Sequence, residues 1–254
     1  MKQLYDNEHI NKPFCVGTNI TQPPLEIQRD NLTREKMLNH IPGLLILDIA
    51  HSCNLHCQIC DIWKTAAVED DIDIAYVKKL LFQAKELDIK EIALSGGESL
   101  LRKDIFDIFE YAQGLKIKNL GVLTNGILVK PYLQKLLPYL IDNTVSLVIS
   151  FDSLKPDLHN RIRNSNLAWQ ETAESLKKLS GLKNTYPQIN FNVITIILNQ
   201  NLEELPELAN FIDTLKANSL QFQALLPNNL IMAERKKSLF WVTEERLSVL
   251  DSII

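Results

Sequence analysis

Residues 47–60, LDIAHSCNLHCQIC, decide the fold, because they place Cys53, Cys57 and Cys60 in the spacing C-x3-C-x2-C directly after an apolar run that begins at Leu44. The short spacers let a single loop wrap one metal centre. Three thiolates bind three irons of a cubane cluster, and the fourth iron then has no protein ligand. The segment therefore predicts a strand followed by a metal-binding loop, with one coordination position open to a small molecule.

Two other interpretations of these cysteines stay open from the spacing alone. A structural zinc ion takes three Cys and one His, and His51 or His56 lies nearby. Zinc sites more often pair two Cys-rich turns, however, and no cysteine follows Cys60; His56 is also adjacent to a cysteine, which makes joint ligation awkward. A disulfide framework fits poorly, because three of the four cysteines are clustered. The fourth, Cys15, is assigned no role.

Composition restricts the class of protein. The 254 residues are 46% hydrophobic and 23% charged, as in ordinary soluble globular proteins, and the net charge is -4. Nucleic-acid binding needs a basic face, so we expect no nucleic-acid partner. No apolar run approaches the roughly 20 residues of a membrane span, and no signal peptide is visible at the N-terminus. We therefore expect a cytoplasmic protein that does not contact a membrane.

Outward from the cysteine segment, short apolar runs alternate with helical patterns. The predicted strands are 44–50, 91–95, 119–124, 145–151, 190–197 and 219–225. These runs show little polar alternation, which is typical of strands that are buried on both faces. The predicted helices cover 74–87, 105–112, 129–140, 173–182 and 205–215, with others near 33–39 and after Thr243. Asp73 is the expected N-cap of the first of the five, and Pro206 is tolerated in the first turn of the last.

Alternation of strand and helix predicts an α/β fold with a parallel sheet and right-handed crossovers. Periodicity does not separate an open doubly wound sheet from a curved, partly closed barrel. Both architectures place functional residues at the carboxyl ends of the strands, so those ends carry the prediction of function.

Polar motifs follow the predicted strands in order. They are Ser95-Gly96-Gly97-Glu98 after the second, Thr124-Asn125-Gly126 after the third, Ser150-Phe151-Asp152-Ser153 after the fourth, then His159-Asn160-Arg161-Ile162-Arg163, and Asn192 within the fifth. Together with C-x3-C-x2-C, and over about residues 44–226, this series resembles the radical S-adenosylmethionine (SAM) superfamily. The cysteine spacing and the GGE motif carry most of the resemblance.

The resemblance implies a partial (β/α)6 TIM-like barrel over 44–226, preceded by an N-terminal extension, 1–43, and followed by a C-terminal segment, 227–254. It implies a [4Fe–4S] cluster on the three cysteines and SAM on the open iron. An electron from the reduced cluster then splits SAM into methionine and a 5′-deoxyadenosyl radical, which takes hydrogen from a peptide or small-metabolite substrate. The implied electron donor is a flavodoxin or a ferredoxin.

The resemblance also implies roles for residues around SAM. Gly96 and Gly97 let the backbone approach the amino group, and Glu98 supports that region or serves as the N-terminal acid of the next helix. Ile59 stands where many members carry an aromatic residue, so we expect it to pack against adenine. Asn125 faces SAM or substrate, or it serves only its Asn-Gly turn.

The resemblance also implies roles for four further residues, and three of them have a second interpretation. Ser150 and Asp152 lie where related enzymes contact the ribose and methionine parts of SAM, although Asp152 also suits an Asx-turn or a helix cap. Arg163 pairs with the SAM carboxylate or is a solvated surface residue. Asn192 needs hydrogen-bond partners inside its apolar strand, and either ribose hydroxyls or a neighbouring strand supplies them.

Two broader questions stay open. The pattern is nearest to members with a C-terminal SPASM or twitch auxiliary cluster, yet no cysteine follows Cys60. Either such a region lies beyond this chain or the protein has none. The alternative functions are a non-enzymatic Fe–S or zinc-binding α/β module, and a variant that transfers a methyl or aminocarboxypropyl group from SAM.

Overall fold

The computed structural model describes residues 42–65 and 71–225, together with Val242, Arg246 and Val249. The chain divides into two units, Met1–His40 and Ile41–Ile254, and all described residues belong to the second. The helix expected near 33–39 and Cys15 lie outside the described residues, as does most of the helix expected after Thr243.

One parallel sheet organises the described part of the chain. Its strands are β1 (Leu44–Ala50), β2 (Glu91–Gly96), β3 (Leu120–Thr124), β4 (Val145–Ser150), β5 (Phe191–Ile197) and β6 (Ser219–Ala224). Each pairs in parallel with the next, so the order across the sheet is the order along the chain. All six predicted strands are confirmed, with ends that differ by no more than one residue.

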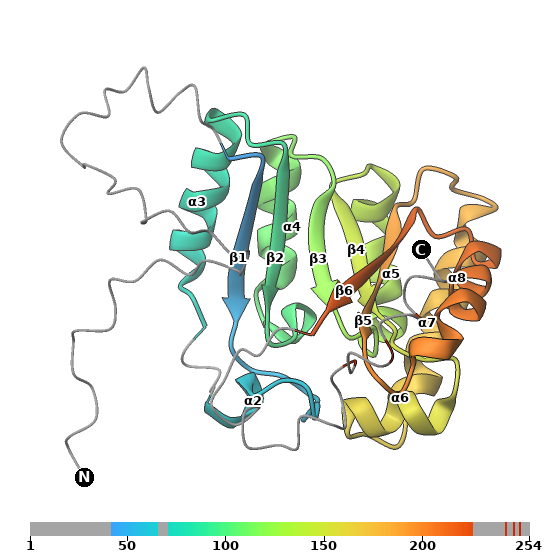
Figure 1. Ribbon diagram of the computed structural model, residues 1–254. Helices are drawn as coiled ribbons and strands as arrows, with labels where there is room; N and C mark the ends of the chain where they lie inside the picture. Colours follow the sequence, from blue (N-terminus) through green and yellow to red (C-terminus); the bar gives the residue numbers. More distant parts are fainter. Residues whose placement is uncertain (1–41, 66–70, 226–241, 243–245, 247–248, 250–254) are drawn as a thin grey trace, which may run out of the picture. The chain divides into compact units, whose positions relative to one another are not determined.

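The strand order decides between the two architectures that periodicity left open, and it confirms the partial barrel that the family resemblance implied. A doubly wound sheet reverses its strand order at a switch point, and the six described strands show no reversal. Right-handed crossovers that always advance in one direction place their helices on one side of the sheet. In Figure 1 the arrowheads of β1 and β3 point toward the end where α2 lies, and β6 crosses in front of β4 and β5. The chain therefore forms the partial, six-stranded TIM-like barrel.

Helices and helical turns connect the strands. They are α2 (Ile62–Thr65), α3 (Ile74–Glu86), η4 (Ser99–Leu101), α4 (Ile105–Gly114), α5 (Val129–Ile141), α6 (Pro156–Arg163), α7 (Ala168–Lys183), η5 (Leu202–Glu204) and α8 (Leu205–Thr214). The five helices predicted between strands are confirmed as α3, α4, α5, α7 and α8. Asp73 caps α3, because its side chain accepts a hydrogen bond from the Ala75 N–H at 2.8 Å.

Helix α6 was not predicted, and it matters for the site. Its sequence, PDLHNRIR, has only Leu158 and Ile162 as apolar residues, too few for a periodic stripe. Proline in the first turn starts the helix, and Asn164, in the left-handed region at φ 50°, ends it.

The main core lies between the sheet and the helices that cover its outer face. Its fully buried strand residues include Leu94, Leu120, Val122, Val145, Leu147, Ile149, Phe191 and Val193, and its helix residues include Leu81, Ile108, Phe109, Leu136, Leu176 and Leu208. The strand residues belong to alternate positions, as expected for side chains that point to one face.

The expectation that the strands are buried on both faces was wrong. The opposite, concave face is only partly covered, and Leu44 and Ile46 are 48% and 56% exposed there. Among the described elements, helices cover a single face of this sheet, and Leu44 and Ile46 on the other face are not part of the core. An apolar run alone does not reveal whether both of its faces are covered.

Candidate cluster and cofactor site

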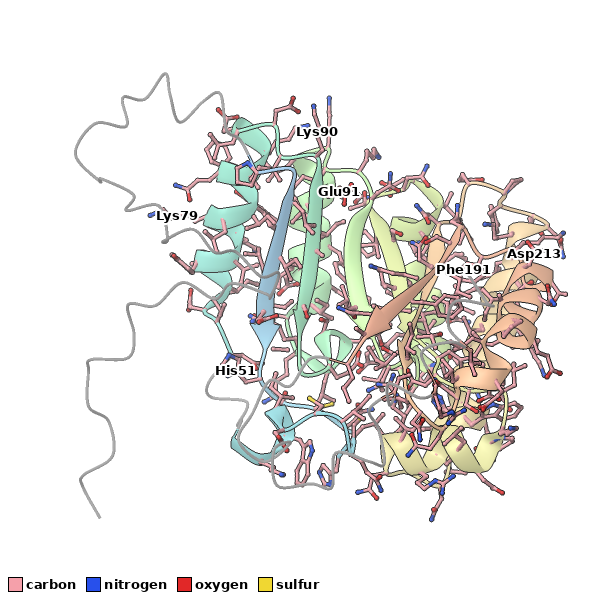
Figure 2. All side chains as sticks on the ribbon, in the orientation of Figure 1. His51, Lys79, Lys90, Glu91, Phe191 and Asp213 are labelled. Atoms are coloured by element: carbon pink, nitrogen blue, oxygen red, sulfur yellow. The ribbon has the colours of Figure 1, made fainter. Side chains whose placement is uncertain are left out.

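The cysteine loop lies at the carboxyl end of the sheet. Figure 2 shows the sulfur atoms, drawn in yellow, beyond the ends of β1 and β2, with His51 at the end of β1. Cys53, Cys57 and Cys60 are all free thiols; Cys57 is buried, Cys53 is half-buried and Cys60 is exposed. One short loop therefore presents three sulfur donors at the edge where parallel sheets bind their ligands.

Burial raises the pKa of two of these thiols, so they ionise less readily without a positively charged partner. It raises the pKa of Cys53 to about 11, against an opposing hydrogen bond from the backbone of Leu55. It also raises the pKa of Cys57, and there the Arg163 guanidinium opposes it through its charge and a hydrogen bond. Metal ligands must be thiolates, so the charge of a bound metal centre would replace the solvation that burial removes.

The described residues do not assemble a site for one metal ion. No three His, Cys, Asp or Glu side chains among them are grouped so that they could hold a single ion. A tetrahedral zinc site needs its ligands to converge on one atom. A cubane distributes its thiolates over three irons, and three free thiols fit that donor set.

Gly96 and Gly97 hold the loop through close backbone contact. The Gly97 N–H donates to the Ala50 carbonyl at 2.6 Å, and the Glu98 N–H donates to the Ser52 carbonyl at 2.9 Å. A Cβ on Gly96 would lie 2.1 Å from the Ala50 oxygen, and one on Gly97 would lie 2.1 Å from the Ser52 oxygen. Gly96 also has φ +119°, which favours glycine. The close approach that requires these glycines is therefore to the cysteine loop itself.

Glu98 is fully buried and joins the ends of two strands. Its carboxylate accepts hydrogen bonds from the Leu100 N–H at 3.1 Å, the Thr124 hydroxyl at 2.7 Å and the Asn125 N–H at 2.8 Å. Burial raises its pKa, and these three donors oppose the shift. The carboxylate caps the η4 turn rather than the helix that follows, so the helix-terminal interpretation holds only for this one turn.

Asn125 serves its turn and also reaches the cysteine loop. Its side-chain oxygen accepts from the Ile127 N–H at 3.1 Å, and its NH2 group donates to the Asn54 side chain at 2.7 Å. Asn54 lies between the first two cysteines. Asn54 was not predicted as a site residue, because an Asn in a loop gives no signal of a partner 71 residues away.

Asp152 and Arg163 form a buried ion pair beside the loop. Two guanidinium nitrogens of Arg163 bind Asp152 Oδ2: Nε at 2.7 Å and Nη2 at 2.6 Å. The other carboxylate oxygen, Asp152 Oδ1, accepts from the Ile196 N–H at 3.1 Å. Burial opposes the charge on Arg163, but Asp152 and Cys57 together raise its pKa. Arg163 is buried, so the alternative interpretation as a solvated surface residue was wrong. The alternative interpretation of Asp152 as an Asx-turn or helix cap was also wrong, because its carboxylate binds Arg163 and the Ile196 N–H.

Helix α6 is also tied to the loop through its backbone, because the Gln58 N–H donates to the Ile162 carbonyl at 2.8 Å. Ile59 packs in a small apolar cluster with Leu158, Ile162, Leu198 and Leu225. Ile59 therefore packs against residues that follow β5 and β6, and its contact with the adenine of SAM stays a prediction.

Two predicted residues lie apart from these contacts. Ser150 is the last residue of β4 and is half-buried on the concave face. Asn192 is the second residue of β5, and its side chain bonds Ser146 at 3.0 Å and Ser219 at 2.8 Å on the neighbouring strands. The structure therefore does not bring Asn192 to the carboxyl edge, and neighbouring strands supply its partners.

His159 was quoted in a motif but given no role. Its Nδ1 accepts a hydrogen bond from the Asp152 N–H at 3.2 Å, and its buried Nε2 has no partner among the described residues. Burial lowers its pKa from 6.5 to about 4. The imidazole is thus neutral and holds the backbone of the residue that pairs with Arg163.

Comparison with known proteins identifies the family. Residues 47–212 match the family described as the Radical SAM superfamily. The chain belongs to this superfamily. It is therefore a radical SAM enzyme, the family's cofactors are a [4Fe–4S] cluster and SAM, and the three free thiols fit the cluster.

Relatives with assigned names are more distant. A probable GTP 3′,8-cyclase of Methanocaldococcus jannaschii is 29% identical over 171 residues, which are 66% of this chain and 54% of that protein. A protein of the same name from Methanothermobacter thermautotrophicus is 31% identical over 118 residues, 46% of this chain and 38% of that protein. The chain spans about half the length of the curated relatives it matches first.

Solved structures show the same fold. Streptococcus suis SuiB bound to S-adenosylmethionine superimposes with a TM-score of 0.68 at 16% identity, over 84% of this chain and 47% of SuiB. The enzyme anSMEcpe with bound AdoMet gives 0.55 at 19% identity, over 72% of this chain and 51% of that one. In the described part of this chain, no helix has the length and apolar character to cross a membrane.

Gly97→Ala should displace the cysteine loop, because the new methyl group would overlap the Ser52 carbonyl. We expect the variant to retain less than half of the wild-type iron after anaerobic reconstitution and desalting, measured by elemental analysis. Gly181→Ala is the matched control: a Cβ there meets nothing within 4 Å, and alanine suits the interior of α7. Equal iron content in the two variants would contradict the conclusion that the close backbone contact at Gly97 holds the cysteine loop.

His159 should make folding stability depend on pH. Its folded-state pKa lies below the ordinary value, so the unfolded chain binds more protons between about pH 4 and 6.5, and stability falls as pH falls through that window. The free energy of unfolding attributable to His159 should decrease by about 2 kcal/mol from pH 7.5 to pH 5. His159→Asn keeps an acceptor for the Asp152 N–H but does not titrate, so its urea-unfolding profile should be flatter. Parallel profiles would refute this assignment.

Proposed function

We propose that this chain binds a [4Fe–4S] cluster through Cys53, Cys57 and Cys60 and binds SAM at the iron that lacks a thiolate. When bound and reduced, the cluster supplies the electron that splits SAM into methionine and a 5′-deoxyadenosyl radical, which abstracts hydrogen from the substrate. The substrate is a peptide or a small metabolite, and a flavodoxin or ferredoxin supplies the electron.

The observation that carries this proposal is the convergence of four strand ends on one cysteine loop. Backbone bonds from Gly97 and Glu98 hold its first part, and Asn125 holds Asn54. Arg163 reaches Cys57 and is itself fixed by a buried carboxylate. Each contact removes freedom from the loop, so its thiols are ordered before a cluster binds.

The remaining groups at the same edge suit SAM. Ser150 presents a hydroxyl with no partner assigned to it among the described residues, and Ile59 offers an apolar surface for adenine. Gly96, Gly97 and Glu98 line the neighbouring strand end. We assign these residues, with Asn125, Asp152 and Arg163, to holding SAM or the loop that carries it, and we place Asn192 outside this set.

The names of the relatives point to two substrate classes. GTP is in the name of the curated relatives, whereas SuiB has been solved bound to its precursor peptide, SuiA. The concave face helps to choose between them. Strand register places these side chains on it: Leu44, Ile46, Asp48, Glu91, Ser95, Ser146, Ser150, Asn192, Ile194, Gln221 and Gln223.

None of the six described strands contains Lys, Arg or His. The concave face instead combines hydroxyl and amide groups with the exposed side chains of Ile46 and Asp48, whereas Glu91 lies at the amino end of β2, away from the cysteine loop (Figure 2). A triphosphate needs cationic partners, and carboxylates would repel it. This face suits a neutral or cationic substrate that is partly apolar, as peptides are.

GTP should therefore fail as a substrate. Adding GTP to the reconstituted, reduced enzyme with SAM should leave the rate of 5′-deoxyadenosine formation within about twofold of the rate without it. Chromatography of the nucleotides should return GTP unchanged. A large stimulation, with loss of GTP, would overturn the choice of substrate class and favour the reaction named for the curated relatives.

Cys57→Ala should abolish SAM cleavage. The protein would be reconstituted anaerobically with iron and sulfide, reduced with dithionite and assayed for 5′-deoxyadenosine. We expect the product from the wild type, and a loss of more than 100-fold in the variant because one iron loses its thiolate. Cys15→Ala is the matched control and should match the wild type, since that cysteine lies outside the motif.

The same chromatogram separates the alternatives. Methylthioadenosine in place of 5′-deoxyadenosine would indicate a group-transfer variant. A protein that copurifies with zinc and forms no Fe–S cluster would be a binding module, contrary to the proposal.

A further inference from the structure

Trp63 makes an unusual contact with the cysteine loop. It lies in α2, three residues after the last cysteine, and its indole Nε1–H donates to the Cys60 carbonyl at 2.9 Å and to the Cys57 carbonyl at 3.3 Å. A single donor thus bridges the backbone of two of the three predicted cluster ligands. Indole nitrogen is a donor only, so Trp63 is not itself a metal ligand.

The turn between these two cysteines needs this support. Its own backbone hydrogen bond, from the Cys60 N–H to the Cys57 carbonyl, is long at 3.4 Å. Bonds of this length are weak, and a short turn with an exposed thiol at its end otherwise samples other peptide orientations. The indole N–H fixes the direction of the Cys60 carbonyl at 2.9 Å and adds a longer contact, at 3.3 Å, to the Cys57 carbonyl.

Two neighbouring side chains contact the indole ring. His56 stacks against it with ring centroids 4.5 Å apart and an interplanar angle of 30°. On α2, the Lys64 ammonium lies 5.4 Å from the ring centroid and also pairs with Asp61 at 2.6 Å. His56 belongs to the cysteine loop and Lys64 to α2, so the groups that contact the ring lie within a few residues of the Cys57–Cys60 turn.

We propose that Trp63 is a positioning residue for the cluster: its indole N–H locks the Cys57–Cys60 turn in the conformation that presents both thiols to the irons. The proposal rests on the proposed function, because it concerns the same cluster. It differs from a packing role, which would depend on the ring and not on its N–H group.

Trp63→Phe tests the N–H group while keeping an aromatic ring. Trp169→Phe is the matched control, because the buried Trp169 Nε1 has no hydrogen-bond partner among the described residues. Each variant would be reconstituted anaerobically, and loss of the visible cluster absorbance to an iron chelator would be followed with time. We expect Trp63→Phe to lose its cluster about fivefold faster than the wild type, and Trp169→Phe to match the wild type.

Two further readouts do not use activity. The electron paramagnetic resonance spectrum of the reduced cluster should change in Trp63→Phe and not in the control. In the apo-protein, where circular dichroism checks the fold, a thiol reagent should react faster with the buried Cys57 of Trp63→Phe. This second measurement reports on the turn even when a variant binds little iron.

The outcomes separate the two proposals. If the wild type forms a cluster and both variants match it in release rate, spectrum and thiol reactivity, the positioning role of Trp63 is overturned and the proposed function stands. If the wild type forms no cluster, the proposed function fails, and the role of Trp63 fails with it. Faster loss of the cluster from Trp63→Phe, but not from Trp169→Phe, supports both the proposed function and the positioning role of Trp63.

Discussion

The close contact between the end of β2 and the loop after β1 is the constraint on which the site depends. Gly96 and Gly97 allow two backbones to lie so near that any side chain would overlap a carbonyl oxygen. In exchange, backbone hydrogen bonds fix the chain just before the first cysteine. A loop of this kind has many accessible conformations, and ordering it costs about 1–2 kcal/mol per residue, so early fixation reduces the entropy that a cluster must overcome on binding.

Buried carboxylates extend this constraint to the next strands. Glu98 gathers donors from the ends of β2 and β3, and Asp152 holds both Arg163 and a backbone N–H of β5. A buried charge without partners is costly, so each carboxylate enforces the geometry of the groups that satisfy it. The carboxyl edge is therefore one polar network, and the thiols are attached to it through Asn54 and Arg163.

The one-sided barrel explains why this edge is available for chemistry. Strands in chain order place the described helices on the outer face of the sheet. The cysteine loop follows β1 at the carboxyl end of that sheet. None of the six described strands contains a Lys, Arg or His side chain.

The sequence by itself determined the parallel α/β fold, all six strands, five helices and the three cysteines, because periodicity and ligand spacing are local properties of the chain. It also located the GGE motif and the residues after β3 and β4. Periodicity left open whether the sheet is a partial barrel, although the resemblance to the radical SAM superfamily implied it, and the strand order confirmed it. Only the tertiary structure decided that helix α6 forms. It alone paired Asp152 with Arg163, Asn54 with Asn125, and Trp63 with the cysteine carbonyls. These contacts depend on the distance and orientation between the groups in space. The period of an apolar pattern contains no information about either.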